Sequence, residues 1–182
     1  MLKVVKLSIE AVWILEYAVK EDNRGISYRY TSKRELEKVG IYTEFVEEIL
    51  YCPRKKGTLY GIHFQNHPKA QTKLLFCTKG KGLDFAVDLR KNSKTYKKWV
   101  CVELTAENRK QLYIRAGFGH AFLSLEDDTH VVMKIDHYFD PGLQRAISYT
   151  DAELDIDFKI SKPILSEQDR KAPLLKDSDC NL

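Results

Sequence analysis

The stretch GTLYGIHFQNHPKAQTK, residues 57–73, decides the fold and contains the first two candidate site residues. An apolar run ends at His63, a loop with Pro68 follows, and the chain returns as an apolar strand opened by Lys73. We expect the two strands to form a hairpin, so that His63 and Lys73 point from neighbouring strands into the mouth of a β-barrel. Such a pair could hold and deprotonate a small polar molecule.

The same strand pattern continues outward along most of the chain. Short segments rich in β-branched and aromatic residues, each bounded by turn residues, lie at 43–51, 58–64, 73–79, 83–90, 98–104, 111–115, 120–125 and 130–139. No long helical segment separates them, which excludes parallel βαβ units. The sequence therefore predicts an all-β protein, an antiparallel jelly-roll β-barrel with a few short surface helices.

The segments on either side of these strands complete the fold prediction. Residues 2–18 alternate as a strand, 26–30 form a short strand, and TSKRELEKVG predicts a surface helix of about two to three turns. Thr31 or Ser32 caps that helix, Glu35 suits a capping box, and Gly40 stops it. We expect one domain over residues 1–182, with a barrel core at about 43–140. The tail after Asp151, with a helical turn in SEQDRKA, is expected to close the site.

Composition narrows the class of protein. A hydrophobic fraction of 43% and a net charge of +4 are typical of a soluble globular protein and make a poor case for nucleic-acid binding. No apolar run approaches the roughly 20 residues of a membrane span, and the N-terminus lacks a signal-peptide core. We interpret Cys52, Cys77, Cys101 and Cys180 as free thiols in a reducing cytoplasm, with Cys77 and Cys101 acting as small hydrophobes in apolar strands.

The histidines allow two interpretations, a metal site or acid–base chemistry. Gly57 with five residues to His63, and AGFGH ending at His120, resemble the two motifs of the cupin jelly roll. Metal-binding cupins carry H-x-H at the first motif, whereas this chain has Gln65, so we expect no metal. A lone His63 is more often a buried core residue, but Lys73 beside it suits proton abstraction α to a carbonyl, with the cation holding the enolate.

A family resemblance covers residues 22 to 175 and is carried mainly by GTLYGIHFQ, by PKAQTKLLFCTKGKGLDFAVDLRKNSKTYKKWVCVELTAENRKQLYIRAGFGHAFLSLED and by LSEQDRKAPLL. These segments resemble the dTDP-4-dehydrorhamnose 3,5-epimerase family of sugar-nucleotide cupins. The resemblance implies a cupin fold, a homodimer and no metal or cofactor. It also implies proton removal and return at carbons 3 and 5 of a 4-keto-6-deoxy sugar.

The resemblance also implies roles for individual residues. His63 is the general base, Asp169 the carboxylate that orients it, and Lys73 the cation beside the 4-keto oxygen. The expected substrate contacts are Arg24 and His120 to the nucleotide sugar, a further contact from Gln71, and the ring of Phe139 stacked on the base.

Departures from the family pattern point to a changed reaction and a changed nucleotide. Met133 stands where the family has its general-acid tyrosine, and a thioether cannot donate a proton. In the family that tyrosine serves chiefly carbon 5, so we predict inversion restricted to carbon 3. The family's nucleotide contacts are also replaced, at Arg29, Glu48, Tyr60 and Gln144. Glu48 could accept hydrogen bonds from a guanine edge, which makes a GDP sugar a candidate.

The sequence thus predicts a cytoplasmic, cofactor-independent epimerase of a nucleoside-diphosphate 4-keto sugar, a deoxyhexose or heptose, for a surface polysaccharide such as a capsule. One alternative is the full 3,5-epimerase acting on dTDP-4-keto-6-deoxyglucose, with another group as acid. Tyr138 and His130 are candidates for that acid, but each lies an odd number of residues from Met133 on an alternating strand and should face away. The other alternative is an inactive sugar-nucleotide binding protein.

Overall fold

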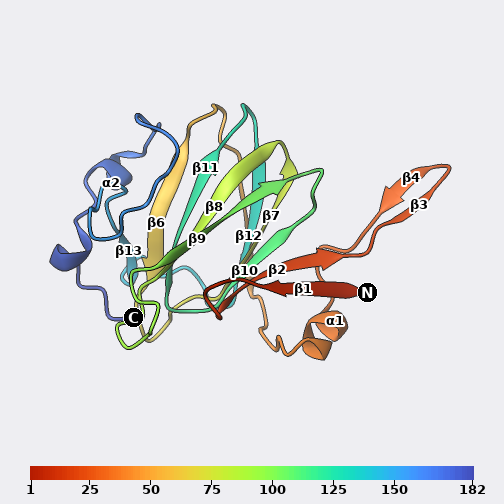
Figure 1. Cartoon of the computed structure of the whole chain (residues 1–182), viewed down its shortest axis with the longest axis horizontal. Coiled ribbons are helices and arrows are strands. Elements are labelled where there is room, and N and C mark those ends of the chain that lie inside the picture. Colours follow the sequence, from red (N-terminus) through yellow and green to blue (C-terminus); the bar gives the residue numbers. More distant parts are fainter.

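A computed structural model describes all 182 residues, which form two antiparallel sheets packed face to face (Figure 1). The six-stranded sheet has the order β1 (Leu2–Lys6), β2 (Val12–Tyr17), β10 (Gln111–Ile114), β7 (Lys73–Lys79), β12 (His130–Ile135), β5 (Glu47–Tyr51). The five-stranded sheet has the order β13 (Gln144–Ala146), β6 (Leu59–Gln65), β11 (Phe118–Ser124), β8 (Lys81–Asp88), β9 (Trp99–Thr105). The predicted all-β jelly roll is confirmed. The sandwich also takes in β1, β2 and β13, which lie outside the range predicted for the barrel core.

The core follows from the two-residue period of the strands. On β7, Leu75 and Cys77 face inward and join the cluster between the two sheets, whereas Leu74 faces outward. That outer face is covered by α1 (Lys33–Lys38) through Leu36. The outer face of the five-stranded sheet is covered by the C-terminal segment, whose Phe158 contacts Phe85 at a ring separation of 4.7 Å.

One predicted pairing is wrong, because β6 and β7 do not form a hairpin. β6 pairs with β11 and β13, whereas β7 pairs with β10 and β12 in the other sheet. The loop containing Pro68 therefore crosses from one sheet to the other. His63 and Lys73 face one another across the sandwich instead of lying on neighbouring strands.

The helix α1 is shorter than predicted and is capped differently. It has six residues, and the Ser32 side chain at its N-cap makes no capping hydrogen bond. Glu35 pairs with Lys38 instead of closing a capping box. The predicted stop is confirmed, because Gly40 has a φ of +80°.

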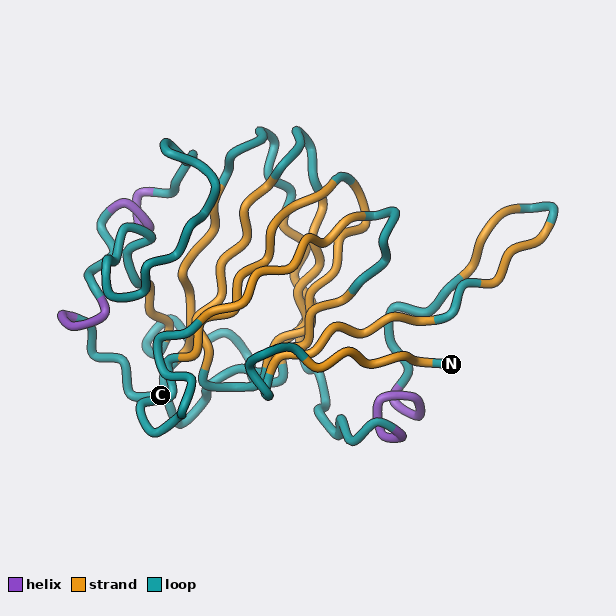
Figure 2. Tube along the Cα trace, in the orientation of Figure 1, coloured by secondary structure: helices purple, strands orange, loops and turns teal.

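Strands β3 (Lys20–Asp22) and β4 (Gly25–Ser27) form a separate hairpin that projects away from the sandwich (Figures 1 and 2). All six of their residues are exposed. Arg24, in the turn of this hairpin, therefore lies far out on the molecule.

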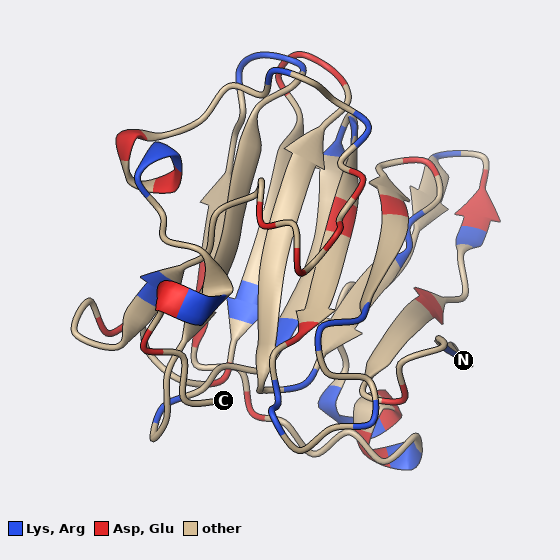
Figure 3. Ribbon diagram, turned by 60° about the vertical axis from the view of Figure 1, so that its left-hand side comes forward, with Lys and Arg blue, Asp and Glu red and all other residues tan.

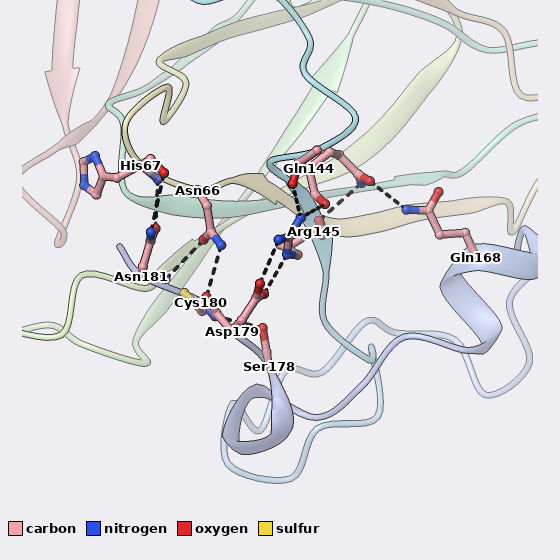
Figure 4. Close-up of polar contacts among 10 residues, drawn as sticks. Asn66, His67, Gln144, Arg145, Gln168, Ser178, Asp179, Cys180 and Asn181 are labelled. Carbon is pink, nitrogen blue, oxygen red and sulfur yellow. Dashed lines mark hydrogen bonds and ion pairs between the residues drawn. The ribbon is translucent and has the colours of Figure 1, made fainter.

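The C-terminal tail is held against the end of β6 and against β13, as Figure 4 shows. Arg145 binds both carboxylate oxygens of Asp179, at 2.6 and 2.7 Å. Asn66 donates to the Asp179 carbonyl at 3.1 Å and accepts from the Asn181 backbone at 3.1 Å. The short helix α2 (Glu167–Arg170) contacts β6, and the 3₁₀ turn η1 (Leu175–Asp177) directly precedes the clamped residues.

Charged residues of both signs are interspersed along loops and strand ends (Figure 3). No helix is long and apolar enough to cross a membrane. The four cysteines are unpaired, as predicted. The interpretation of Cys101 as a packed hydrophobe is wrong, however, because its side chain on β9 is exposed.

Candidate active site

A cavity of about 360 Å³ lies between the two sheets and collects most of the predicted site residues. Eight of them line it, namely Tyr60, His63, Gln71, Lys73, His120, Met133, Phe139 and Gln144. Asp169 lies behind His63 on α2. The structure does not bring Arg24, Arg29 or Glu48 into the wall of this cavity.

A bulge in β6 turns two of its residues into the cavity. Tyr60 pairs with Phe122 and His63 pairs with His120. The two β6 residues are three positions apart and their β11 partners only two, so β6 carries one extra residue. Without the extra residue, Tyr60 and His63 would point to opposite faces of the sheet. Gly61 permits the bulge, because its φ is +99° and a Cβ there would lie 2.4 Å from the His120 carbonyl oxygen.

His63 is held by a buried carboxylate. Its Nε2 lies 2.5 Å from Asp169 Oδ1, and Ser166 donates to Asp169 Oδ2 at 2.9 Å. Burial opposes ionisation of Asp169, but its bond to His63, the charge of that ring and the bond from Ser166 outweigh burial and hold the pKa of Asp169 below its usual value. Because Nε2 faces Asp169, Nδ1 is the nitrogen left for a substrate.

Lys73 enters the cavity from the opposite sheet with only 4% of its surface exposed. Its Nζ donates to Gln71 Oε1 at 3.0 Å, and Gln71 in turn donates to the His137 carbonyl at 3.0 Å. Burial lowers the pKa of Lys73 to about 8, although Asp136 and Asp84 partly offset this effect. The predicted Gln71 thus orients the ammonium group.

A second histidine–carboxylate contact lies beside the first. His120 Nε2 is 3.0 Å from Asp84 Oδ1, but the contact lacks hydrogen-bond geometry and neither oxygen of Asp84 has another partner. Asp84 is completely buried, and burial raises its pKa despite the nearby charges of His120 and Lys73. Sequence reasoning missed Asp84, although an acidic residue within the apolar segment LDFAVD was a usable signal.

The prediction for Glu48 is off by one residue. Strand β5 alternates, so that Glu47, Ile49 and Tyr51 line the cavity while Glu48 faces away. The Glu48 carboxylate instead accepts a hydrogen bond from Lys134 at 2.7 Å. Glu47, at the cavity edge, accepts from the Phe139 backbone at 3.3 Å.

The two predicted arginine contacts lie outside the cavity. The Arg24 side chain is 84% exposed and binds Asp22 within its own hairpin. Arg29 is exposed in the segment that follows. In one chain, therefore, neither side chain reaches the cavity.

The far wall carries Met133, at the position where the family resemblance implies a tyrosine. Met133 is buried and pairs across the strands with Ile49, while its neighbour Val131 pairs with Tyr51. His130 and Tyr138 do not line the cavity, in agreement with the alternation argument. No group of three or more His, Cys, Asp or Glu side chains that could hold a metal ion is present.

Together these groups suit acid–base chemistry on a polar molecule. A carboxylate-held imidazole on one wall can accept a proton, and a buried ammonium on the other can stabilise negative charge on oxygen. The exposed ring of Phe139 and the Glu47 carboxylate offer recognition groups at the edge.

The chain is similar to known proteins over nearly its whole length. The family model described as dTDP-4-dehydrorhamnose 3,5-epimerase matches residues 6–177. The dTDP-4-dehydrorhamnose 3,5-epimerase of Shigella flexneri is 37% identical over 179 residues, 98% of each chain.

Solved structures agree. The Bacillus anthracis dTDP-4-dehydrorhamnose 3,5-epimerase with TDP and pyrophosphate bound has a TM-score of 0.94 and 37% identity, covering 96% of this chain and 100% of that one. A 3'-monoepimerase from Streptomyces bikiniensis in complex with dTDP-quinovose has a TM-score of 0.86 and 32% identity, covering 94% and 87%. The family match over nearly the whole chain, together with these structures, shows that the protein is a sugar-nucleotide epimerase with the cupin fold and belongs to the dTDP-4-dehydrorhamnose 3,5-epimerase family.

Proposed function

We propose that the protein inverts carbon 3, and not carbon 5, of a nucleoside-diphosphate 4-keto deoxy sugar. The observation that carries this proposal is the pairing of an intact His63–Asp169 dyad on one wall with Met133 on the other. By the family resemblance, position 133 belongs to the general-acid tyrosine that serves chiefly carbon 5. The similar 3'-monoepimerase from Streptomyces bikiniensis supports such a restriction within the family.

The proposed reaction begins with proton abstraction by His63. Its Nδ1 takes the proton from carbon 3, while Asp169 accepts the Nε2 hydrogen bond and stabilises the imidazolium. Lys73 lies near the 4-keto oxygen and offsets the negative charge of the enolate. Loss of any one of these three groups should reduce the rate roughly 100-fold or more.

The methionine explains why carbon 5 would keep its configuration. A thioether has no proton to give. An enolate formed toward carbon 5 would then lack a donor at position 133 on the face where inversion requires one. Removal and return of the carbon 5 proton therefore give no net inversion through this residue.

Incubation in deuterated water tests the restriction. We expect deuterium together with inversion at carbon 3, and a retained configuration at carbon 5 whether or not deuterium enters there. Inversion at carbon 5 as fast as at carbon 3 would instead support the full 3,5-epimerase. Absence of exchange into every 4-keto sugar nucleotide tried would support an inactive binding protein.

The nucleotide has two candidates. The similar structures hold TDP or dTDP-quinovose, which favours a dTDP sugar. Glu47 favours GDP, because a carboxylate accepts two hydrogen bonds and guanine presents two donors, N1–H and N2–H, on one edge. Thymine presents one donor between two carbonyl acceptors. The hypothesis first placed on Glu48 thus transfers to Glu47.

Calorimetric titration with dTDP and GDP separates the two candidates. If the substrate is a GDP sugar, GDP should bind more tightly than dTDP. Glu47→Gln should then weaken the binding of GDP more than the binding of dTDP. Tighter binding of dTDP by the unaltered protein contradicts it. Glu48→Gln is the matched control, since that carboxylate lies outside the cavity and should leave both affinities unchanged.

The wider setting stays a prediction. The homodimer, the cytoplasmic location and a role in surface-polysaccharide synthesis rest on the family resemblance and the sequence. Light scattering coupled to size-exclusion chromatography measures the oligomeric state directly, and a monomer at micromolar concentration would contradict the homodimer.

A further inference from the structure

Inversion at carbon 3 leaves an unanswered question, the source of the returning proton. His63 lies on β6 of the five-stranded sheet, so the proton must reach carbon 3 from the six-stranded sheet opposite. The residues that line the cavity from that sheet are mostly apolar. The groups there with an N–H, O–H or carboxyl are Glu47, Tyr51 and Lys73.

Two of these three groups have other partners. Lys73 donates to Gln71. Ile135 pairs with Lys73 on one side and with Glu47 on the other, so Lys73 and Glu47 lie at the same level of the sheet. Glu47 accepts a hydrogen bond from the Phe139 backbone at the cavity edge. Lys73 is the group that offsets enolate charge in the proposed reaction, and Glu47 acts here as an acceptor.

Tyr51 is placed beside the position that Met133 leaves without a donor. On β5 it follows Ile49, the register partner of Met133, by two residues and so shares its face. The Tyr51 ring packs against Tyr60 from the other sheet, with 5.2 Å between ring centroids. Its hydroxyl makes no hydrogen bond to another protein group and is free to reach a substrate in the cavity.

The surroundings of Tyr51 keep its phenol protonated. Burial raises the pKa of Tyr51, and the neighbouring Tyr60 and Glu47 raise it further. An enolate carbon is a far stronger base than a phenolate, so a protonated tyrosine is an effective donor to it.

We propose that Tyr51 is the catalytic acid that returns the proton to carbon 3, acting from the wall that Met133 leaves without a donor for carbon 5. The proposal rests on the proposed epimerase function. The Tyr51 O–H bond breaks as the C3–H bond forms on the face opposite His63, and the enolate electron pair restores the 4-keto group. His63 is left as an imidazolium and Tyr51 as a phenolate. Proton exchange with water resets both groups, without oxidant or reductant.

The variant Tyr51→Phe tests this role, because it removes one oxygen and keeps the ring that packs on Tyr60. We expect carbon 3 inversion to fall at least about 100-fold. Exchange of the substrate's carbon 3 hydrogen with deuterated water should stay within about fivefold of the unaltered enzyme, because His63 and Lys73 still form the enolate. Exchange without inversion is a result that a purely structural role would not produce.

The matched control is Tyr138→Phe, which removes a phenol that is largely exposed and outside the cavity. The rate of carbon 3 inversion by this variant should stay within about twofold of that of the unaltered enzyme. Equal loss of exchange and inversion in Tyr51→Phe, or normal inversion, overturns the assignment of Tyr51. If the unaltered enzyme exchanges no hydrogen at carbon 3, the proposed function itself fails, so the two failures are distinguishable.

Discussion

Replacing Asp169 by asparagine removes one negative charge behind His63 and little else. The amide oxygen can still accept from His63 Nε2, where the carboxylate lies at 2.5 Å. The amide nitrogen then faces Ser166, whose hydroxyl oxygen can accept in place of donating. The tautomer of His63 and the short helix around residue 169 should therefore be preserved, so that the variant isolates the effect of charge.

The size of the loss follows from the charge pair that forms when His63 accepts a proton. Two unit charges about 4 Å apart attract by about 4 kcal/mol at an effective dielectric constant of 20. The His63 side chain is 30% exposed, so solvent screens part of this energy. A remaining loss of about 2–4 kcal/mol corresponds to roughly a 30- to 1,000-fold decrease in kcat.

Steady-state kinetics with a 4-keto sugar nucleotide measure the effect. We expect the loss in kcat, with KM within about threefold, because the charge acts on proton transfer more than on binding. Asp155→Asn is the matched control, since this exposed carboxylate on the same C-terminal segment has no role in the cavity. A kcat for Asp169→Asn within about threefold of the unaltered enzyme would remove Asp169 from the mechanism.

Four further predictions concern other parts of the site. Because the pKa of Lys73 is about 8 in the folded protein, kcat/KM should fall above pH 8 as the cation is lost. Lys73→Arg should abolish this decrease, because arginine stays protonated. If the decrease is unchanged in Lys73→Arg, another group causes it. The pKa of Lys73 in the folded protein also lies below the value of about 10.4 in the unfolded chain. Between these two pH values the unfolded chain binds more protons than the folded protein, so the free energy of unfolding should rise with pH. Urea unfolding at pH 8 and pH 10 measures this change. Met133→Tyr places a phenol in the cavity wall and should allow inversion at carbon 5. An unchanged configuration at carbon 5 would contradict the explanation of the carbon 3 restriction. Gly61→Ala puts a Cβ 2.4 Å from the His120 carbonyl oxygen, on a residue whose φ is +99°. The free energy of unfolding should fall by about 1–3 kcal/mol, which corresponds to a decrease of roughly 2–12 °C in Tm by calorimetry. An unchanged Tm would show that the bulge relaxes without strain.

Local sequence patterns determined the strands of this protein. Alternation of apolar and polar residues is a property of neighbouring positions, so it located β7 at residues 73–79 without error and most other strands within a few residues. Gly40, with its left-handed φ, likewise marked the end of the first helix. The family motifs then predicted His63, Lys73 and Asp169, and the structure brings the three to one cavity.

Only the tertiary structure decided how those strands meet. It placed Lys73 across the sandwich from His63, since the pairing of β6 with β11 and of β7 with β12 depends on contacts between distant segments. It also showed that Glu47 faces the cavity in place of Glu48, because one residue of register exchanges the two faces of a strand.

The residues that sequence reasoning missed, Asp84 and Tyr51, share one physical reason. Neither belongs to a spaced motif. Each takes its chemistry from burial and from side chains that only the folded sheets bring close, Tyr60 for Tyr51, and His120 with Lys73 for Asp84. The amino-acid sequence determined which groups are present and which way each strand alternates, whereas the packing of two sheets determined which groups meet and what protonation state they keep.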